Sequence, residues 1–215
     1  MTMSESSCAV TDVHTSTRRL VAAGLCCALS GLSGILVGLV TVAYPPAVPA
    51  GQWSYPFTTG TQWVVSLVLV LTHLLTAVGF VGIIEADPHR GRRVTTIGLW
   101  VAVVGFVALA VAELLSGAIG GEEFDSSAVS AVGTLFGVAS LATAVGGVVA
   151  GVGILRAGQR RGVVGWAVLA SALIMLLLVT PANIGGGLVV RTVALMVWSL
   201  PFLPLGRTLA RGPSS

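Results

Sequence analysis

The chain has 215 residues, of which 55% are hydrophobic and only 9% are charged, whereas a soluble domain carries about 25% charged residues. The mean hydropathy of +0.98 argues against a soluble globular fold, because so much apolar surface could not be hidden from water. The net charge of +3 does not indicate a nucleic-acid partner. Ten of the eleven arginines lie in four short segments beside apolar runs, where arginine orients spans in a membrane.

Apolar runs of about 20 residues recur along the chain, and each is long enough to cross a hydrocarbon core about 30 Å thick. The sequence therefore predicts an all-α fold, a polytopic transmembrane helical bundle with six spans. The expected spans cover residues 20–43, 63–84, 95–119, 128–155, 163–180 and 188–206. Residues 18–206 form the transmembrane domain, between a flexible polar tail at 1–17 and a second tail at 207–215.

Two of the expected spans carry a stripe of small residues along one face. In the first span these residues are Gly24, Gly31, Gly34 and Gly38, and in the fourth they are Gly133, Gly137, Ser140, Ala144, Gly147 and Gly151. Small residues let two helix backbones approach closely in a membrane, so we expect the first and fourth spans to pack together. The alternative is that each stripe meets another helix or a second protomer.

The longest connection, residues 44–62, contains four prolines together with Trp53, Tyr55 and Phe57. Proline opposes a helix there, and the aromatic rings favour the headgroup level, so we expect this loop to fold over one mouth of the bundle. Its stretch PAVPAGQWSYPF resembles the first outer loop of small six-span membrane proteins of actinobacteria. That resemblance implies a membrane location and no particular activity.

The arginines outside the spans predict how the chain is oriented. They are Arg18, Arg19, Arg90, Arg92, Arg93, Arg156, Arg160, Arg161, Arg207 and Arg211. The turn at residues 120–125 is acidic and has no arginine. Because arginine is enriched on the cytoplasmic side, we expect both termini in the cytoplasm of a bacterial cell whose inner membrane the chain crosses several times.

Only three ionisable residues lie inside the expected spans: His73, Glu113 and Arg191. Such groups are expensive in a bilayer and therefore mark candidate functional sites. Side chains lean toward the amino end of their helix, so His73 and Glu113, on antiparallel neighbours, lean toward each other. We predict a contact between them, direct or through water, with Arg191 as a counter-charge. The alternative is that His73 bonds Thr72 or Thr76 while the two charged residues extend to the outer headgroups.

Two functional interpretations follow. The first is a non-enzymatic protein with a structural, regulatory or accessory role. It would lie in the lipid bilayer and pack through its small-residue faces against a second copy or another membrane protein. The alternative is a small proton- or cation-linked transporter or channel that uses His73 and Glu113. The stretch Gly31-Leu32-Ser33-Gly34 matches a short motif of rhomboid-type intramembrane proteases. Its serine lies in the wrong helix for that family and has no recognisable oxyanion donor, so we do not expect an enzyme.

Metals and cofactors are not expected from this sequence. His14 lies in the tail, His73 in mid-membrane and His89 in a connection, while Cys26 and Cys27 lie near the inner end of the first span. Four ligands at one depth, as a zinc site needs, are therefore lacking. No phosphate-binding glycine loop is recognisable either.

Overall fold

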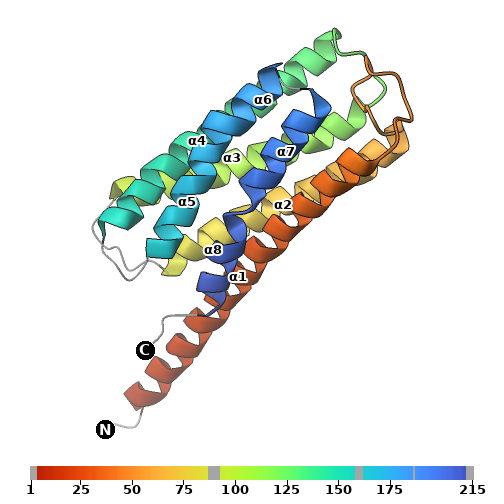
Figure 1. Cartoon of the computed structure of the whole chain (residues 1–215). Helices are drawn as coiled ribbons and strands as arrows, with labels where there is room; N and C mark the ends of the chain where they lie inside the picture. Colours follow the sequence, from red (N-terminus) through yellow and green to blue (C-terminus); the bar gives the residue numbers. More distant parts are fainter. Residues whose placement is uncertain (1–3, 87–92, 158–161, 186, 212–215) are drawn as a thin grey trace.

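The computed structural model describes residues 4–86, 93–157, 162–185 and 187–211, and these residues form an antiparallel bundle of helices (Figure 1). Six helical stretches are long and apolar enough to cross a membrane. They cover Arg18–Ala43, Thr59–Glu85, Arg93–Ala118, Ser127–Arg156, Gly162–Asn183 and Leu188–Ala210. The six expected spans are confirmed, and no boundary differs from its predicted position by more than four residues.

The first four spans are the single helices α1 (Ser4–Ala43), α2 (Thr59–Ala86), α3 (Arg93–Ala118) and α4 (Ser127–Arg156), whereas the last two spans are composite. The fifth joins α5 (Gly162–Ile174), the π-helical segment η2 (Met175–Val179) and α6 (Thr180–Gly185), and the sixth joins α7 (Leu188–Ser199) and α8 (Phe202–Ala210). Helix α3 lies between α2 and α4, α5 contacts α4 and α8, and α1 packs against α2, α7 and α8. The last span therefore returns to the first and closes the bundle.

The surface of the bundle is apolar, and many of its polar side chains are buried. Leu71, Val104 and Leu177 are 57%, 64% and 69% exposed, while Ser30 and Thr76 are buried. Water would not tolerate such an exterior, but lipid tails are as apolar as leucine. The distribution therefore fits a helical bundle whose solvent is a bilayer.

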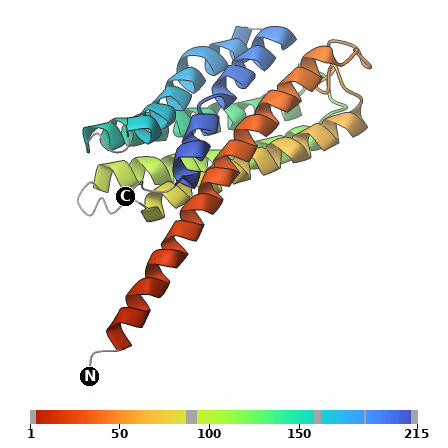
Figure 2. The ribbon, with the colours of Figure 1, turned by 60° about the horizontal axis from the view of Figure 1, so that its bottom comes forward.

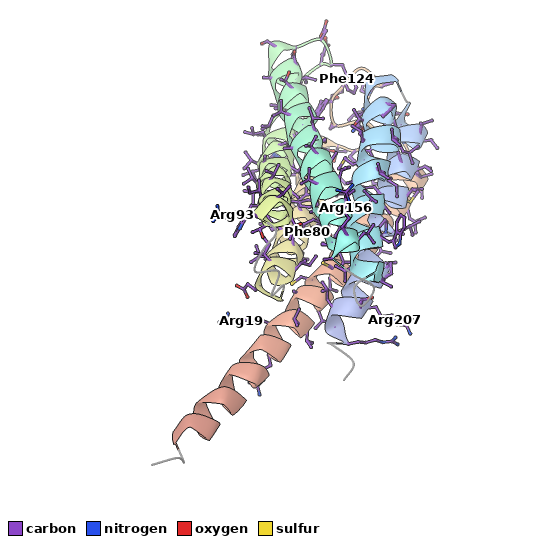
Figure 3. All side chains as sticks on the ribbon, turned by 90° about the vertical axis from the view of Figure 1, so that its left-hand side faces the viewer. Arg19, Phe80, Arg93, Phe124, Arg156 and Arg207 are labelled. Carbon is purple, nitrogen blue, oxygen red and sulfur yellow. The ribbon has the colours of Figure 1, made fainter. Side chains whose placement is uncertain are left out.

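The two ends of the bundle differ in charge. One end, here called the arginine end, holds the amino-terminal side of the first span, the α2–α3 and α4–α5 connections and the end of α8. The described arginines near it are Arg18, Arg19, Arg93, Arg156, Arg207 and Arg211, and Arg19 pairs with Glu85 at 3.6 Å across its exposed surface. The opposite loop end holds residues 44–58, residues 119–126, the end of α6 and the start of α7. Figure 3 shows Arg19 and Arg207 far from Phe124, which lies at the loop end. Arg90, Arg92, Arg160 and Arg161 lie outside the described residues.

Helix α1 is longer than predicted. Residues 4–17 were expected as part of a flexible tail, but they continue the first span as helix beyond the rest of the bundle (Figure 1 and Figure 2). Extending an existing helix needs no new nucleus, so residues without an apolar face can add turns to it. At the other end of the chain, α8 extends through Ala210 and includes Arg207, which was expected in the second tail.

The prediction that the first and fourth spans pack together is wrong, because the glycines of α1 face the sixth span. A Cβ atom on Gly24 would lie 2.5 Å from the backbone nitrogen of Ala210, and one on Gly206 would lie 2.5 Å from the carbonyl oxygen of Gly24. Gly31 and Gly34 face Ser199 in the same way. Helices α1 and α8 thus cross with their backbones nearly in contact.

The small-residue stripe of α4 divides into two parts. Ser140 and Ala144 are buried, and Gly147 and Gly151 pack against Ala172 and Leu169 of α5. Nearer the loop end, Gly133 and Gly137 have no described atom within 4 Å of the place where a Cβ would stand. One part of the stripe therefore packs inside the protein, and the other part lies on an open surface.

The closest approach of α4 to another helix uses a glycine outside the predicted stripe. A Cβ atom on Gly98 of α3 would lie 2.9 Å from the carbonyl oxygen of Gly146, and one on Gly146 would lie 2.5 Å from the backbone nitrogen of Ala102. Two glycines at one crossing let the backbones of α3 and α4 meet.

The fifth span continues through Pro181, where the sequence predicted an end at residue 180 and a turn. The backbone N–H of Thr180 reaches back five residues to the carbonyl oxygen of Met175, and the Thr180 hydroxyl donates to the same oxygen at 2.9 Å. This π-helical widening directly precedes the residue that has no N–H. It lets the helix pass the proline, as helices in a bilayer do when local groups re-satisfy the backbone.

The sixth span is interrupted, where the sequence predicted one helix. Helix α7 ends at Ser199, and the N–H of Leu200 bonds the carbonyl oxygen of Val197 in a tightened last turn. Pro201 then breaks the hydrogen-bond ladder because it has no N–H, and α8 begins at Phe202. The break lies in the interior, since Ser199 and Phe202 are both buried.

Candidate functional site

His73 and Glu113 meet in the interior of the bundle. Nε2 of His73 lies 3.8 Å from Oε1 of Glu113, and the two side chains are 9% and 13% exposed. This separation allows an ion pair when the imidazole is protonated, and it is too long for a hydrogen bond. The contact predicted from the opposite directions of the two helices is therefore present, and Glu113 does not extend to the surface.

The threonine hydroxyl groups beside His73 form hydrogen bonds with serine hydroxyls of helix α1. Thr72 pairs with Ser33 at 2.9 Å, and Thr76 pairs with Ser30 at 2.5 Å. Both threonines also donate to carbonyl oxygens of α2. The alternative that His73 bonds one of these hydroxyls is therefore wrong, and Ser33 is paired with a threonine rather than with a histidine base.

Nδ1 of His73 is buried and has no hydrogen-bond partner among the described residues. Leaving such a group unsatisfied in the interior costs about 1–3 kcal/mol. Unpaired buried polar atoms are rare in native proteins, and each calls for an explanation. The ring is held between Glu113 on one side and the indole of Trp198, whose centroid lies 6.1 Å from its own.

All three ionisable residues of the spans line one cavity of about 210 Å³. His73 reaches it from α2, Glu113 from α3 and Arg191 from the first turn of α7. Helix α1 contributes Gly34 and Gly38 to the same wall. The topology thus brings together three groups that lie far apart in the sequence.

Arg191 is not neutralised by the protein. It is half-buried, and no carboxylate oxygen of the described residues lies within 4.0 Å of its guanidinium nitrogens. The only ion pair at the cavity joins His73 to Glu113 within the described part of the chain. The cavity therefore holds one guanidinium and one carboxylate that do not pair with each other.

The loop of residues 44–58 folds over the loop end of the bundle, as the sequence predicted, and the cavity beneath it stays partly open. Trp53, Tyr55, Pro56 and Phe57 line the cavity from this side. The loop is bound to the α3–α4 connection by backbone hydrogen bonds from Trp53 to Glu122, from Ser54 to Gly120 and from Phe124 to Gly51. The Trp53 indole donates to the Ser116 hydroxyl at 2.9 Å, which fixes the loop to α3.

Aromatic residues close the cavity toward the arginine end. Trp198 forms the last part of the lining, and beyond it Phe202, Phe106 and Phe80 pack in succession with ring centroids 5.1–6.3 Å apart. All four are at most 4% exposed. The break between α7 and α8 falls between Trp198 and Phe202, so the closed side of the cavity lies beside an interrupted helix.

Several residues of the cavity were not anticipated as site residues. Ser116, Thr192, Ser199 and Trp198 line it, but they are ordinary members of apolar runs in the sequence. Trp53 and Phe57 carried a partial signal, since an aromatic loop without a helix was expected over a mouth of the bundle. Only the packing of α7 beside α1 reveals Thr192, Trp198 and Ser199, while Ser116 reaches the cavity from α3.

Six helices of the described chain are long and apolar enough to cross a membrane, and they define its class, a multispanning membrane protein. No family model, no curated protein and no solved structure matches it. The functional argument therefore depends on the geometry of the site.

Proposed function

We propose that this protein binds a small polar ligand in the cavity at its loop end and acts as a small proton-linked transporter of the bacterial inner membrane. The observation that carries the proposal is the convergence of His73, Glu113 and Arg191 on one cavity. Polar groups at membrane depth usually mark substrate and proton pathways. His73 is the proton-responsive element, because histidine changes charge between about pH 5 and pH 8.

The interrupted sixth span supports transport over static binding. Transporters commonly build their sites at helices that are broken inside the membrane. Here Trp198 and Phe202 flank the break and close the cavity toward the arginine end. A rearrangement at Pro201 would move these rings, so the closed side of the cavity lies where the helix is least continuous.

The cavity is proposed to open to the outside of the cell. The arginines gather at the opposite end, which the positive-inside rule assigns to the cytoplasm. Both termini would then be cytoplasmic, and the acidic connection at residues 120–125 would be external. No bond-making chemistry is required of the site, so the proposed role is not enzymatic.

One observation supports the alternative of a structural or accessory role. Gly133 and Gly137 lie on an open face of α4, where a second copy or another membrane protein could approach. The glycines of α1, in contrast, are used inside the chain against α7 and α8. The open face is compatible with transport and does not account for the charged cavity.

Ligand-induced stabilisation in nanodiscs tests the proposal. A ligand that binds only the folded state raises the unfolding midpoint. We expect at least one of five classes of small solute (carboxylates, amines, zwitterions, sugars and inorganic ions) to raise the midpoint of the wild type. The exposed control Glu85→Gln should respond equally, and Glu113→Gln should respond less. If no class acts, or if Glu113→Gln responds like the wild type, the proposal is wrong.

A further inference from the structure

The cavity presents two opposite charges that do not neutralise each other. Arg191 enters from α7 and Glu113 from α3, and both line the same space of about 210 Å³. Their charged atoms are more than 4.0 Å apart, since no ion pair joins them in the described part of the chain. Separated charges of this kind match a ligand that carries both signs.

We infer that the ligand is a small zwitterion, an α-amino acid with an apolar side chain. Its carboxylate pairs with the guanidinium of Arg191, and its ammonium group pairs with the carboxylate of Glu113. Charge-assisted hydrogen bonds of this type are about twice as strong as neutral ones. This inference rests on the proposed function, because it names the ligand of the same cavity.

The size and the walls of the cavity agree with such a ligand. A cavity volume of about 210 Å³ is well above the minimum that a single water molecule needs, so it can hold a small organic molecule. Val65 and Leu69 of α2 and Leu195 of α7 line the cavity together with the Trp198 indole. These walls suit an aliphatic side chain.

The charges around the cavity favour a neutral ligand over an anion. With His73 neutral, Glu113 and Arg191 sum to zero. Glu122, Glu123 and Asp125 are exposed at the loop end, beside Phe124, which lines the cavity. An anion would have to pass these carboxylates, whereas a zwitterion experiences little net force from them.

His73 competes with the ligand for Glu113. A protonated imidazole would be the partner of the carboxylate, whereas a neutral ring would leave the carboxylate available to an ammonium group. The other charged or titratable groups facing the cavity are Arg191 from α7 and Tyr55 from the loop, while the described lining of α1 contributes none. Protonation of His73 and binding of an ammonium group to Glu113 therefore oppose each other.

Three probes of similar shape test the inference: L-valine, isovalerate, which lacks the amine, and isobutylamine, which lacks the carboxylate. Their binding to the full chain in nanodiscs is measured by calorimetry at about pH 5.5 and about pH 7.5, on either side of the usual histidine titration. We expect valine to bind about tenfold or more tightly than either analogue, as the loss of one charge-assisted hydrogen bond implies. Valine should also bind more tightly at the higher pH.

Two variants assign the two ends of the ligand. Arg191→Gln should abolish the advantage of valine over isobutylamine, and Glu113→Gln should abolish its advantage over isovalerate. Arg207→Gln and Glu85→Gln, at exposed positions, are the matched controls and should behave like the wild type. Circular dichroism and gel filtration identify a variant that fails to fold, and Arg191→Lys then provides a charged replacement with weaker bidentate pairing.

The possible failures are distinguishable. If isovalerate or isobutylamine binds as tightly as valine and depends on Arg191 or Glu113, the zwitterion assignment is wrong but the proposed site stands. If valine binds with no dependence on either residue, the assignment is also overturned. If neither the three probes nor the wider set of solutes responds to Glu113→Gln, the proposed function fails with it.

Discussion

Nε2 of His73 and Oε1 of Glu113 lie 3.8 Å apart on two antiparallel helices, and each side chain is at least 87% buried. The two residues are separated in the sequence by three turns of α2, a connection and most of α3. They meet because α2 and α3 pack side by side. Side chains lean toward the amino end of their own helix, so His73 leans toward the loop end and Glu113 leans toward the arginine end, and the two converge.

We predict that the two residues are energetically coupled. In a double-mutant cycle of His73→Gln and Glu113→Gln, the coupling free energy should be about 1 kcal/mol, within the range for contacting residues. It should be larger at about pH 5.5 than at about pH 7.5, since the imidazolium form carries the charge. Reversible unfolding in mixed micelles measures it. Additive effects at both pH values would show that the proximity carries no interaction.

The crossing of α1 and α8 yields a second prediction. Gly24→Ala should destabilise the protein by about 1–3 kcal/mol, as overpacking of a close contact does, because the new Cβ would meet the backbone of Gly206 and Ala210. The matched substitution Gly133→Ala has no described atom within 4 Å. It should be neutral or stabilising, since alanine is the better helix former by about 1 kcal/mol. Thermal unfolding of both variants is the measurement, and equal midpoints would contradict the described crossing.

The orientation of the chain provides a third prediction. A green fluorescent protein fused to the carboxyl terminus should be fluorescent, and alkaline phosphatase fused at the same place should be inactive, because we expect that terminus in the cytoplasm. The opposite pair of results would reverse the orientation. The cavity would then open toward the cytoplasm, while its residues and geometry would remain as described.

The general architecture could be predicted from the sequence because it depends on solvent. Runs of apolar residues and the positions of the arginines determine how many helices cross a bilayer, and no knowledge of their neighbours is needed. The contact between His73 and Glu113 was predictable for a similar reason. It joins two helices that are consecutive in the chain and therefore adjacent.

Which helices pack together was not predictable from the small residues. A glycine such as Gly24 allows close packing of any neighbouring helix. The stripe of small residues therefore does not indicate whether that neighbour is α4 or α8. Arg191 was expected beside His73 and Glu113 as a counter-charge, and it lines the same cavity but forms no ion pair with Glu113. Pro181 was misread since its effect depends on the π-helical segment before it, a hydrogen-bond adjustment that leaves no pattern in the sequence.

The accessibility of the cavity to water tests the central claim most directly. In a background with Cys8→Ser, Cys26→Ala and Cys27→Ala, a cysteine is placed at Leu69, which lines the cavity, or at Leu71, which is 57% exposed on the lipid-facing surface. A membrane-impermeant thiol reagent added outside intact cells should modify Leu69→Cys and leave Leu71→Cys unmodified, because thiolates form only in contact with water. Equal protection of both cysteines, or modification of Leu71→Cys alone, would contradict a cavity that is open to water on the outside of the cell.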